Sequence, residues 1–363
     1  MAKRARIEGV DVARGLASLI MIQGHAYDGW VNASGKETAA YAFTRVLGSL
    51  PLPAFLVLAG AAVVLRSDAA APRGESARDV RRAVVRRGLW VVLYGYLTNL
   101  VYALMDGWTG PETFLRADVL HVIGLSIVAL SLLGIRGADA PTRRSMWWGA
   151  SLLTVLPTAL SVWLSPLGAH LSGPVGALAA LFVDVPGVTV MPFVPLASWV
   201  GLGALACLAV LTSSGAAEKV PLAGASDRFF LGLALVSIVL VAFGNTLMTT
   251  LLDLLGGSLS RAHPAVIGNV IDLGARGLLV LAGGALLTAR LPVPARTLLV
   301  RVGRGSLVAY VFHIPFCYGR LGAPLRGQLD MATATVFVIA LMALSVVAVL
   351  FRQRVARWRR QRG

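Results

Sequence analysis

The sequence predicts an all-α integral membrane protein that crosses the bilayer about ten times. Of its 363 residues, 57% are hydrophobic and only 14% are charged, and the mean hydropathy is +0.76. A soluble domain needs a more polar surface than this, so lipid must surround most of the side chains. Two further observations support this fold class: long apolar runs recur along the chain, and basic residues gather in alternate connections.

The apolar runs are long enough to cross a bilayer, which takes roughly 20 helical residues each. They lie at 10–30, 48–65, 88–105, 118–135, 146–164, 191–212, 229–250, 266–287, 305–321 and 331–351. The apolar run 175–183 is too short to span, and we expect a re-entrant or interfacial segment at 165–190. No long linker or internal repeat interrupts the series, so we expect a single membrane domain over residues 1–363.

Charge placement predicts the orientation. The 33 Lys and Arg against 17 Asp and Glu, a net charge of +16, would favour a nucleic-acid partner in a soluble chain. Here the basic residues cluster at 1–9, 66–87, 136–144, 213–228, 288–304 and 352–363. The positive-inside rule places these stretches, including the short basic tails at both termini, in the cytoplasm. We therefore expect membrane lipid, and no nucleic acid, as a partner.

Some polar or reactive residues within the spans have a structural explanation. Cys207 and Cys317 fall inside apolar runs, where we expect buried small hydrophobic side chains rather than a disulfide or a metal site. Asp272 and Arg276 are spaced i, i+4 and are expected to form an ion pair. Small residues such as Gly203 predict close packing between helices.

The first span carries the strongest candidate for chemistry. His25 is followed by Asp28 three residues later, one turn along the same face, which is an acid/base arrangement. Arg14 lies eleven residues before His25, so it returns to within about 20° of the same face, about 16 Å away along the axis. One stripe of the helix therefore runs from a cytoplasmic cation to a histidine in the outer half. The alternative is that each histidine is only a satisfied hydrogen-bonding group.

Four further residues are possible site residues. Asp118 and His121 repeat the three-residue spacing at the outer mouth of the fourth span, where a helix start with Asp118 near its N-terminus is the simpler interpretation. His313 lies near the middle of the ninth span, three residues after Tyr310.

Several motifs together resemble those of the transmembrane acyltransferase superfamily, and in particular the bacterial relatives of heparan-α-glucosaminide N-acetyltransferase. The motifs occupy residues 6–15, 21–28, 53–60, 118–124, 193–195 and 303–315. In that superfamily an arginine and a histidine are separated by ten residues, as Arg14 and His25 are. The related surface-polysaccharide O-acyltransferases carry two arginines with two residues between them, and Arg78 and Arg81 are similar to this pair.

The resemblance implies an enzyme of the bacterial cytoplasmic (inner) membrane. It implies transfer of an acyl group from cytoplasmic acyl-coenzyme A to a hydroxyl or amine on the outer face. The favoured acyl group is acetyl, with acetyl-coenzyme A as the donor. The implied acceptor is a glycan or another small molecule, and the implied donor contacts are Arg14, Arg78 and Arg81. We assign His25 as general base, with Asp28 holding the imidazolium. A covalent acyl-histidine is the other mechanism considered.

Two other classes of protein compete with this interpretation. A transporter or lipid-handling protein without chemistry would explain the intramembrane charges Asp272 and Arg276, but it would be expected to show related halves or broken helices, which the sequence does not show. An inactive sensor or scaffold would be expected to have lost His25 or Arg14, and both are present.

Overall fold

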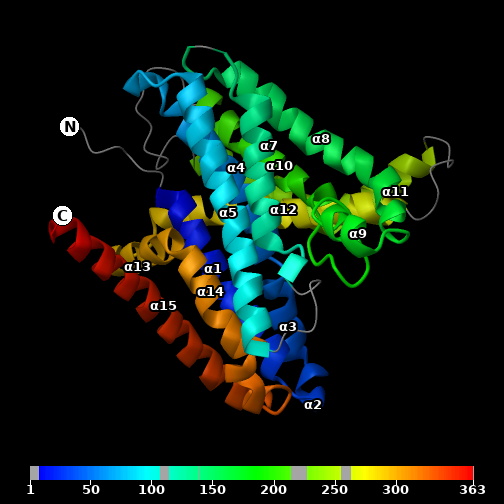
Figure 1. Ribbon diagram of the computed structural model, residues 1–363, viewed down its shortest axis with the longest axis vertical. Helices are drawn as coiled ribbons and strands as arrows, with labels where there is room; N and C mark the ends of the chain where they lie inside the picture. The colour runs from blue at the N-terminus through cyan, green and yellow to red at the C-terminus, as the bar shows by residue number, and fades with distance from the viewer. Residues whose placement is uncertain (1–7, 107–113, 138, 214–226, 255–262, 363) are drawn as a thin grey trace. The chain divides into compact units, whose positions relative to one another are not determined.

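The computed structural model (Figure 1) is all-helical over the residues that it describes, which are 8–106, 114–137, 139–213, 227–254 and 263–362. The α-helices are α1 (Glu8–Trp30), α2 (Ala33–Lys36), α3 (Ala39–Gly48), α4 (Pro51–Asp68), α5 (Ala77–Asp106), α7 (Val119–Gly134), α8 (Arg143–Gly168), α9 (Gly173–Ala179), α10 (Phe193–Ser213), α11 (Asp227–Leu254), α12 (His263–Thr288), α13 (Val293–Arg304), α14 (Ser306–Cys317) and α15 (Met331–Arg362). Two short 3₁₀ helices, Ala71–Arg73 and Arg320–Leu325, complete the elements.

Each of the apolar runs coincides with a helix, which confirms the predicted fold class of an all-α polytopic membrane protein. Within the described residues, five helical stretches have the length and hydropathy to cross a membrane. They are Ala39–Asp68, Phe193–Ser213, Asp227–Leu247, Asn269–Thr288 and Met331–Arg362. The number of spans and the cytoplasmic termini stay predictions, and the basic stretches 1–7 and 214–226 lie outside the described residues.

The chain forms two compact units, which are described separately. The first unit comprises Met1–Ala54, Pro221–Asp227 and Val280–Gly363, and the second comprises Phe55–Val220 and Arg228–Leu279. The single membrane domain expected from the sequence stays a prediction.

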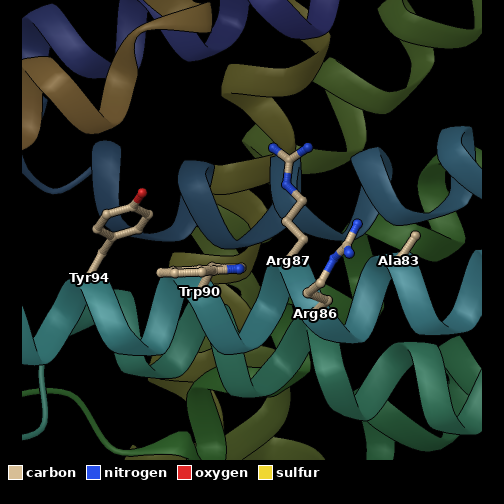
Figure 2. Close-up of a pocket in the computed structure, with 5 residues that line it drawn as sticks. All are labelled: Ala83, Arg86, Arg87, Trp90 and Tyr94. Carbon is tan, nitrogen blue, oxygen red and sulfur yellow. The ribbon is translucent and has the colours of Figure 1, made fainter.

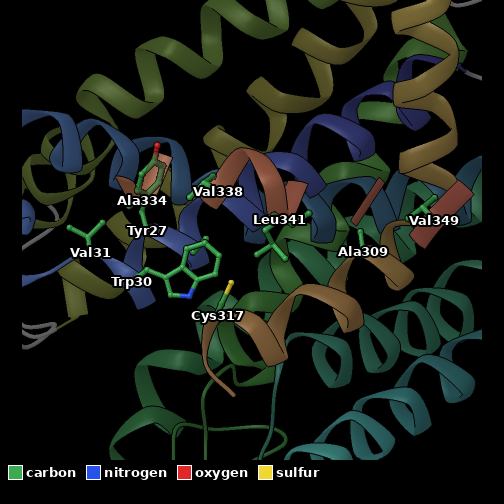
Figure 3. Close-up of a cluster of buried hydrophobic side chains, with 11 residues drawn as sticks. Tyr27, Trp30, Val31, Ala309, Cys317, Ala334, Val338, Leu341 and Val349 are labelled. Carbon is green, nitrogen blue, oxygen red and sulfur yellow. The ribbon is translucent and has the colours of Figure 1, made fainter. Parts of the chain in front are cut away.

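In the first unit, α1 packs against α3, α13, α14 and α15. Figure 3 shows the apolar cluster that joins α1, α14 and α15. Its members include Trp30, Cys317, Val338 and Leu341, all buried. Burying large apolar side chains contributes about 1.5–3 kcal/mol each, so this cluster holds the C-terminal helices against α1. Cys317 is a free cysteine, and it is buried, as predicted.

Helix α13 lies in the stretch 288–304, which the sequence suggested only as a basic connection. Its close approach to α1 depends on glycines: a side chain at Gly15 would collide with the Leu299 backbone, and one at Gly303 with the Asp11 carbonyl. Val300 and Val302 are buried. Tertiary packing against α1 therefore converts a charged connection into a helix.

In the second unit, α10 packs closely against two helices through the small residues noted in the sequence. Gly203 meets the Val57 backbone on α4, and Gly201 meets Thr154 on α8. This confirms the expected close packing at Gly203. Cys207, also on α10, is a buried free cysteine.

The segment 165–190 begins with the last turn of α8, and after it the short helix α9 is the one α-helix in the segment. Ala117, Ala180, Val183 and Val185 form a small buried cluster there. The Val190 N–H donates to the Ala117 carbonyl at 3.0 Å, which attaches the segment to the start of α7. The segment therefore folds on itself instead of spanning, although its depth in a membrane stays a prediction.

The i, i+4 pair on α12 is formed as predicted. The Arg276 Nε lies 3.2 and 3.1 Å from the two carboxylate oxygens of Asp272, and an Nη2 contact at 3.0 Å completes a two-pronged ion pair. Because Asp272 and Arg276 neutralise each other, their presence in an apolar helix is explained without a role in transport.

Replacing Gly203 with Ala should destabilise the protein, because the added methyl group would overlap the Val57 backbone. Overpacking of this kind costs about 1–3 kcal/mol. The matched control is Gly232→Ala on α11, where nothing lies within 4 Å of the new methyl group. It should be neutral or stabilising by up to about 1 kcal/mol, because Ala favours helix more than Gly does. Thermal unfolding of the purified protein in detergent measures both, and equal midpoints would contradict the packing.

Candidate active site

One unbroken helix, α1, carries Arg14, His25 and Asp28. Because no kink interrupts Glu8–Trp30, the eleven residues from Arg14 to His25 span about 16 Å and end on nearly the same face. The stripe expected from the sequence is therefore present. His25 is half-buried, and both Gly24 and Ala26 beside it are buried.

The His25 ring is hydrogen-bonded to the ring of His313. His25 Nδ1 and His313 Nε2 are 2.9 Å apart, and the two rings stack with centroids 5.1 Å apart and planes inclined by 21°. His313 is fully buried, and its Nδ1 lies 2.8 Å from the Ala309 carbonyl oxygen. The structure therefore brings together two candidates that are 288 residues apart in the sequence.

Backbone contacts one turn beyond each histidine set this geometry. Gly29 follows His25 by four residues, and Cys317 follows His313 by four. A side chain at Gly29 would collide with the Cys317 carbonyl, so glycine is required for α14 to approach α1 this closely. The Trp30 Nε1–H also donates to the carbonyl of Phe316 at 2.9 Å.

Asp28 lies in a polar network beside the histidine pair. Its Oδ1 accepts from Arg45 Nη1 at 3.1 Å and from the Tyr41 hydroxyl at 3.3 Å, and its Oδ2 accepts from the Tyr318 hydroxyl at 3.1 Å. The Tyr318 ring lies 5.4 Å from the His25 ring, centroid to centroid. Asp28 is thus connected to the surroundings of His25 through Tyr318, a residue that the sequence analysis missed. Nothing in the local sequence indicates this contact.

Tyr310 and His313 lie on α14. The Tyr310 ring is buried and meets the His313 ring edge-on, with centroids 6.1 Å apart. Tyr310 therefore packs beside the second histidine of the pair.

Arg14 belongs to a cluster of three charges with Asp11 and Arg304. The Arg304 Nε lies 3.0 Å from Asp11 Oδ2, whereas the Arg14 Nη1 lies 3.8 Å from Asp11 Oδ1. Together these three side chains carry a net charge of +1. The sequence missed Arg304 because it comes from α13.

His121 and Asp118 belong to the second unit and cap α7. The Asp118 Oδ1 accepts from the Val119 N–H at 2.6 Å, and the Asp118 N–H donates to His121 Nδ1 at 3.1 Å. This confirms the helix-start interpretation. The His121 ring is fully buried against Tyr96, with centroids 4.3 Å apart, and a side chain at Gly95 would collide with it.

The two arginines of the suggested pair have different surroundings. Arg78 is exposed on the first turns of α5, whereas Arg81 is half-buried and donates to the Ile135 carbonyl at 3.3 Å. Arg81 therefore caps the C-terminal end of α7, which is a structural role. Nearby, hydrogen bonds from Arg66 and Arg73 lower the pKa of the Glu75 carboxyl.

A shallow recess of about 440 Å³ lies along α5 in the second unit (Figure 2). Arg86, Arg87, Trp90 and Tyr94 line it with Ala83. The guanidinium groups beside an indole could bind a phosphate next to a planar ring. In the sequence, Arg86 and Arg87 indicate only topology, although the i, i+4, i+8 spacing of Arg86, Trp90 and Tyr94 places those three along one ridge.

Within the part of the chain that the structure describes, no group of three or more His, Cys, Asp and Glu side chains has metal-binding geometry.

Apolar helices that carry ionisable side chains define an integral, multi-pass membrane protein with a polar site. The particular family follows from a comparison with protein families. The family described as "Heparan-alpha-glucosaminide N-acetyltransferase, catalytic" matches residues 6–220, which is over half of the chain, and the chain belongs to this family of membrane acetyltransferases. A comparison with curated proteins finds no match. The matched region includes His25 but not His313 or Tyr318.

Arg81→Gln should lower the melting temperature, because the Ile135 carbonyl loses its guanidinium donor. The expected cost is about 1 kcal/mol of unfolding free energy. Arg78→Gln removes the same charge from an exposed position and should change stability by less than about 0.5 kcal/mol. Thermal unfolding of the two variants side by side makes the comparison, and equal melting temperatures would remove the structural explanation for Arg81.

Proposed function

We propose that this membrane acetyltransferase moves an acetyl group from cytoplasmic acyl-coenzyme A to a hydroxyl or amine of an acceptor, a glycan, at the outer face. The proposed location is the bacterial cytoplasmic membrane, and membrane lipid is the expected surrounding. The observation that carries the proposal is the unbroken helix α1, with a cation cluster near one end and His25 on the same face about 16 Å away. This distance is comparable to the length of a pantetheine arm.

The donor's phosphates are proposed to meet Arg14. Its cluster with Asp11 and Arg304 keeps one net positive charge, and the Arg14 side chain is 18% exposed, so an anionic group gains electrostatically by binding there. Arg78 and Arg81 are proposed as further donor contacts on the basis of the superfamily resemblance. The hydrogen bond of Arg81 to the Ile135 carbonyl makes Arg78 the better candidate of the two.

The proposed chemistry is general base catalysis by His25. The acceptor's O–H or N–H proton goes to His25 as the acceptor atom attacks the thioester carbonyl carbon. The new C–O or C–N bond forms, the C–S bond breaks, and the coenzyme A thiolate leaves and takes up the proton from His25. Asp28 favours the protonated imidazole by its charge and holds Tyr318 beside the ring. A covalent acyl-histidine would require His25 itself to attack the thioester, and we favour it less.

The transporter alternative gains no specific support from the structure, because Asp272 and Arg276 neutralise each other.

Arg14→Gln should weaken the binding of acetyl-coenzyme A by about ten- to a hundredfold, because the loss of a charge-assisted hydrogen bond costs about 1.5–3 kcal/mol and each 1.4 kcal/mol is tenfold. Calorimetric titration of the full chain in lipid nanodiscs measures this affinity. Acetyl-pantetheine, which lacks the nucleotide, should bind both forms equally. The control Arg359→Gln/Arg360→Gln removes two exposed charges from α15 and should leave the affinity unchanged. An unaltered affinity in Arg14→Gln would reject Arg14 as a donor contact.

His25→Ala should abolish acetyl transfer while retaining acetyl-coenzyme A binding, because a general base contributes about 10²–10⁴-fold to the rate and does not hold the nucleotide. Asp28→Asn should show a smaller loss, because it removes only the charge. Turnover per folded molecule is measured with radiolabelled acetyl-coenzyme A in reconstituted vesicles. His121→Ala is the comparison, since a structural histidine should lower yield and not turnover. Near-normal turnover in His25→Ala would end the general-base proposal.

A further inference from the structure

We propose that His313 is the positioning residue for His25, and that it selects Nε2 as the basic nitrogen of His25. This inference rests on the proposed function of His25 as general base. It assigns a role to a residue of the C-terminal segment, which lies beyond the family match at 6–220.

The tautomers follow from the hydrogen-bond chain. The Ala309 carbonyl can only accept, so His313 Nδ1, at 2.8 Å, carries a proton and donates it. With both rings neutral, His313 Nε2 is then an acceptor, and it can bond His25 Nδ1 at 2.9 Å only if that nitrogen carries the proton. His25 Nε2 is left as the unprotonated nitrogen that can take a proton from the acceptor.

The position of His313 suits this role because the ring has little freedom to move. It is fully buried on α14, is bonded at both nitrogens, and packs edge-on against Tyr310. The approach of α14 to α1 is set one turn further on, at Gly29 and Cys317. A general base must be held within hydrogen-bond reach of its proton, and a second ring bonded to the first achieves this.

A neutral histidine differs from a carboxylate in the same position. It orients the base and accepts its N–H, but it brings no negative charge into the buried site. When His25 takes up a proton at Nε2, the positive charge is shared with His313 through the hydrogen bond between His25 Nδ1 and His313 Nε2. The chain then ends at the Ala309 carbonyl, which cannot accept a proton for onward transfer. The proton therefore stays on the two rings until the leaving thiolate removes it.

The experiment compares His313→Leu, which removes the acceptor, with His313→Gln, whose amide oxygen can still accept from His25. Full-length protein in nanodiscs is labelled with [¹⁵N]histidine, and the His25 signal is assigned by its loss in His25→Ala. Nitrogen chemical shifts report which ring nitrogen carries the proton, without any need for turnover. Turnover gives kcat and the KM for acetyl-coenzyme A. The control is His170→Leu, since His170 is exposed in the second unit.

We expect His25 to be protonated at Nδ1 in the wild type and in His170→Leu, and at Nε2 in His313→Leu. In His313→Leu, kcat should fall by about 10²-fold or more with KM unchanged, and His313→Gln should recover part of the loss. A general loss of folding would instead reduce the yield of protein and would not lower kcat per folded molecule at an unchanged KM.

Three results would overturn the inference. The first is a wild-type His25 that is protonated at Nε2, and the second is full kcat in His313→Leu. The third is a His313→Gln variant that folds but whose kcat falls by the same factor of about 10² that is expected for His313→Leu. The last applies even if His313→Leu fails to fold. A different outcome separates the two proposals. If His25→Ala kept full turnover while wild-type His25 was protonated at Nδ1 as expected, the proposed function would fail, and the His25–His313 hydrogen bond would be structural only.

Discussion

The close approach of α1 to α14 is the constraint on which the candidate site depends. Two helix backbones can meet at Gly29 and Cys317 only because Gly29 has no side chain to separate them. One turn earlier on both helices, this contact leaves room for two stacked imidazole rings and a 2.9 Å hydrogen bond. A displacement of about 1 Å at the contact would be enough to break that bond. The apolar cluster around Trp30 and Leu341 then stabilises the arrangement without contributing any chemistry.

Helix α1 holds charged side chains in apolar surroundings, and each of its aspartates has oppositely charged or hydrogen-bonding partners. Asp11 is compensated by Arg304, and the Asp28 carboxylate accepts from Arg45, Tyr41 and Tyr318. Burying an unpaired charge would be costly, so these partners are what allow a cation cluster and a histidine to sit on one helix. Because the partners come from α3, α13 and the end of α14, the chemistry of α1 depends on segments that are distant in the sequence.

Several residues show how far local reasoning reaches. The sequence predicts the helix start at Asp118, since capping is a local interaction between a side chain and the next backbone N–H groups. Arg81 matched a motif spacing, but its guanidinium reaches the Ile135 carbonyl, a contact 54 residues away that spacing cannot reveal. Arg86 and Arg87 were treated as topology signals, and only the surface of α5 shows them lining a recess with Trp90.

The sequence by itself determined where the long apolar helices lie, because hydropathy, capping and i, i+4 pairing act within one helix, as the Asp272–Arg276 pair shows. It also singled out Arg14 and His25, whose common face follows from helix geometry alone. Only the tertiary structure decided the partner of His25 Nδ1 and the helical state of α13. They depend on contacts across 288 residues, between His25 and His313, and across 293 residues, between Asp11 and Arg304. No local pattern encodes such contacts, because they arise from the packing of whole helices.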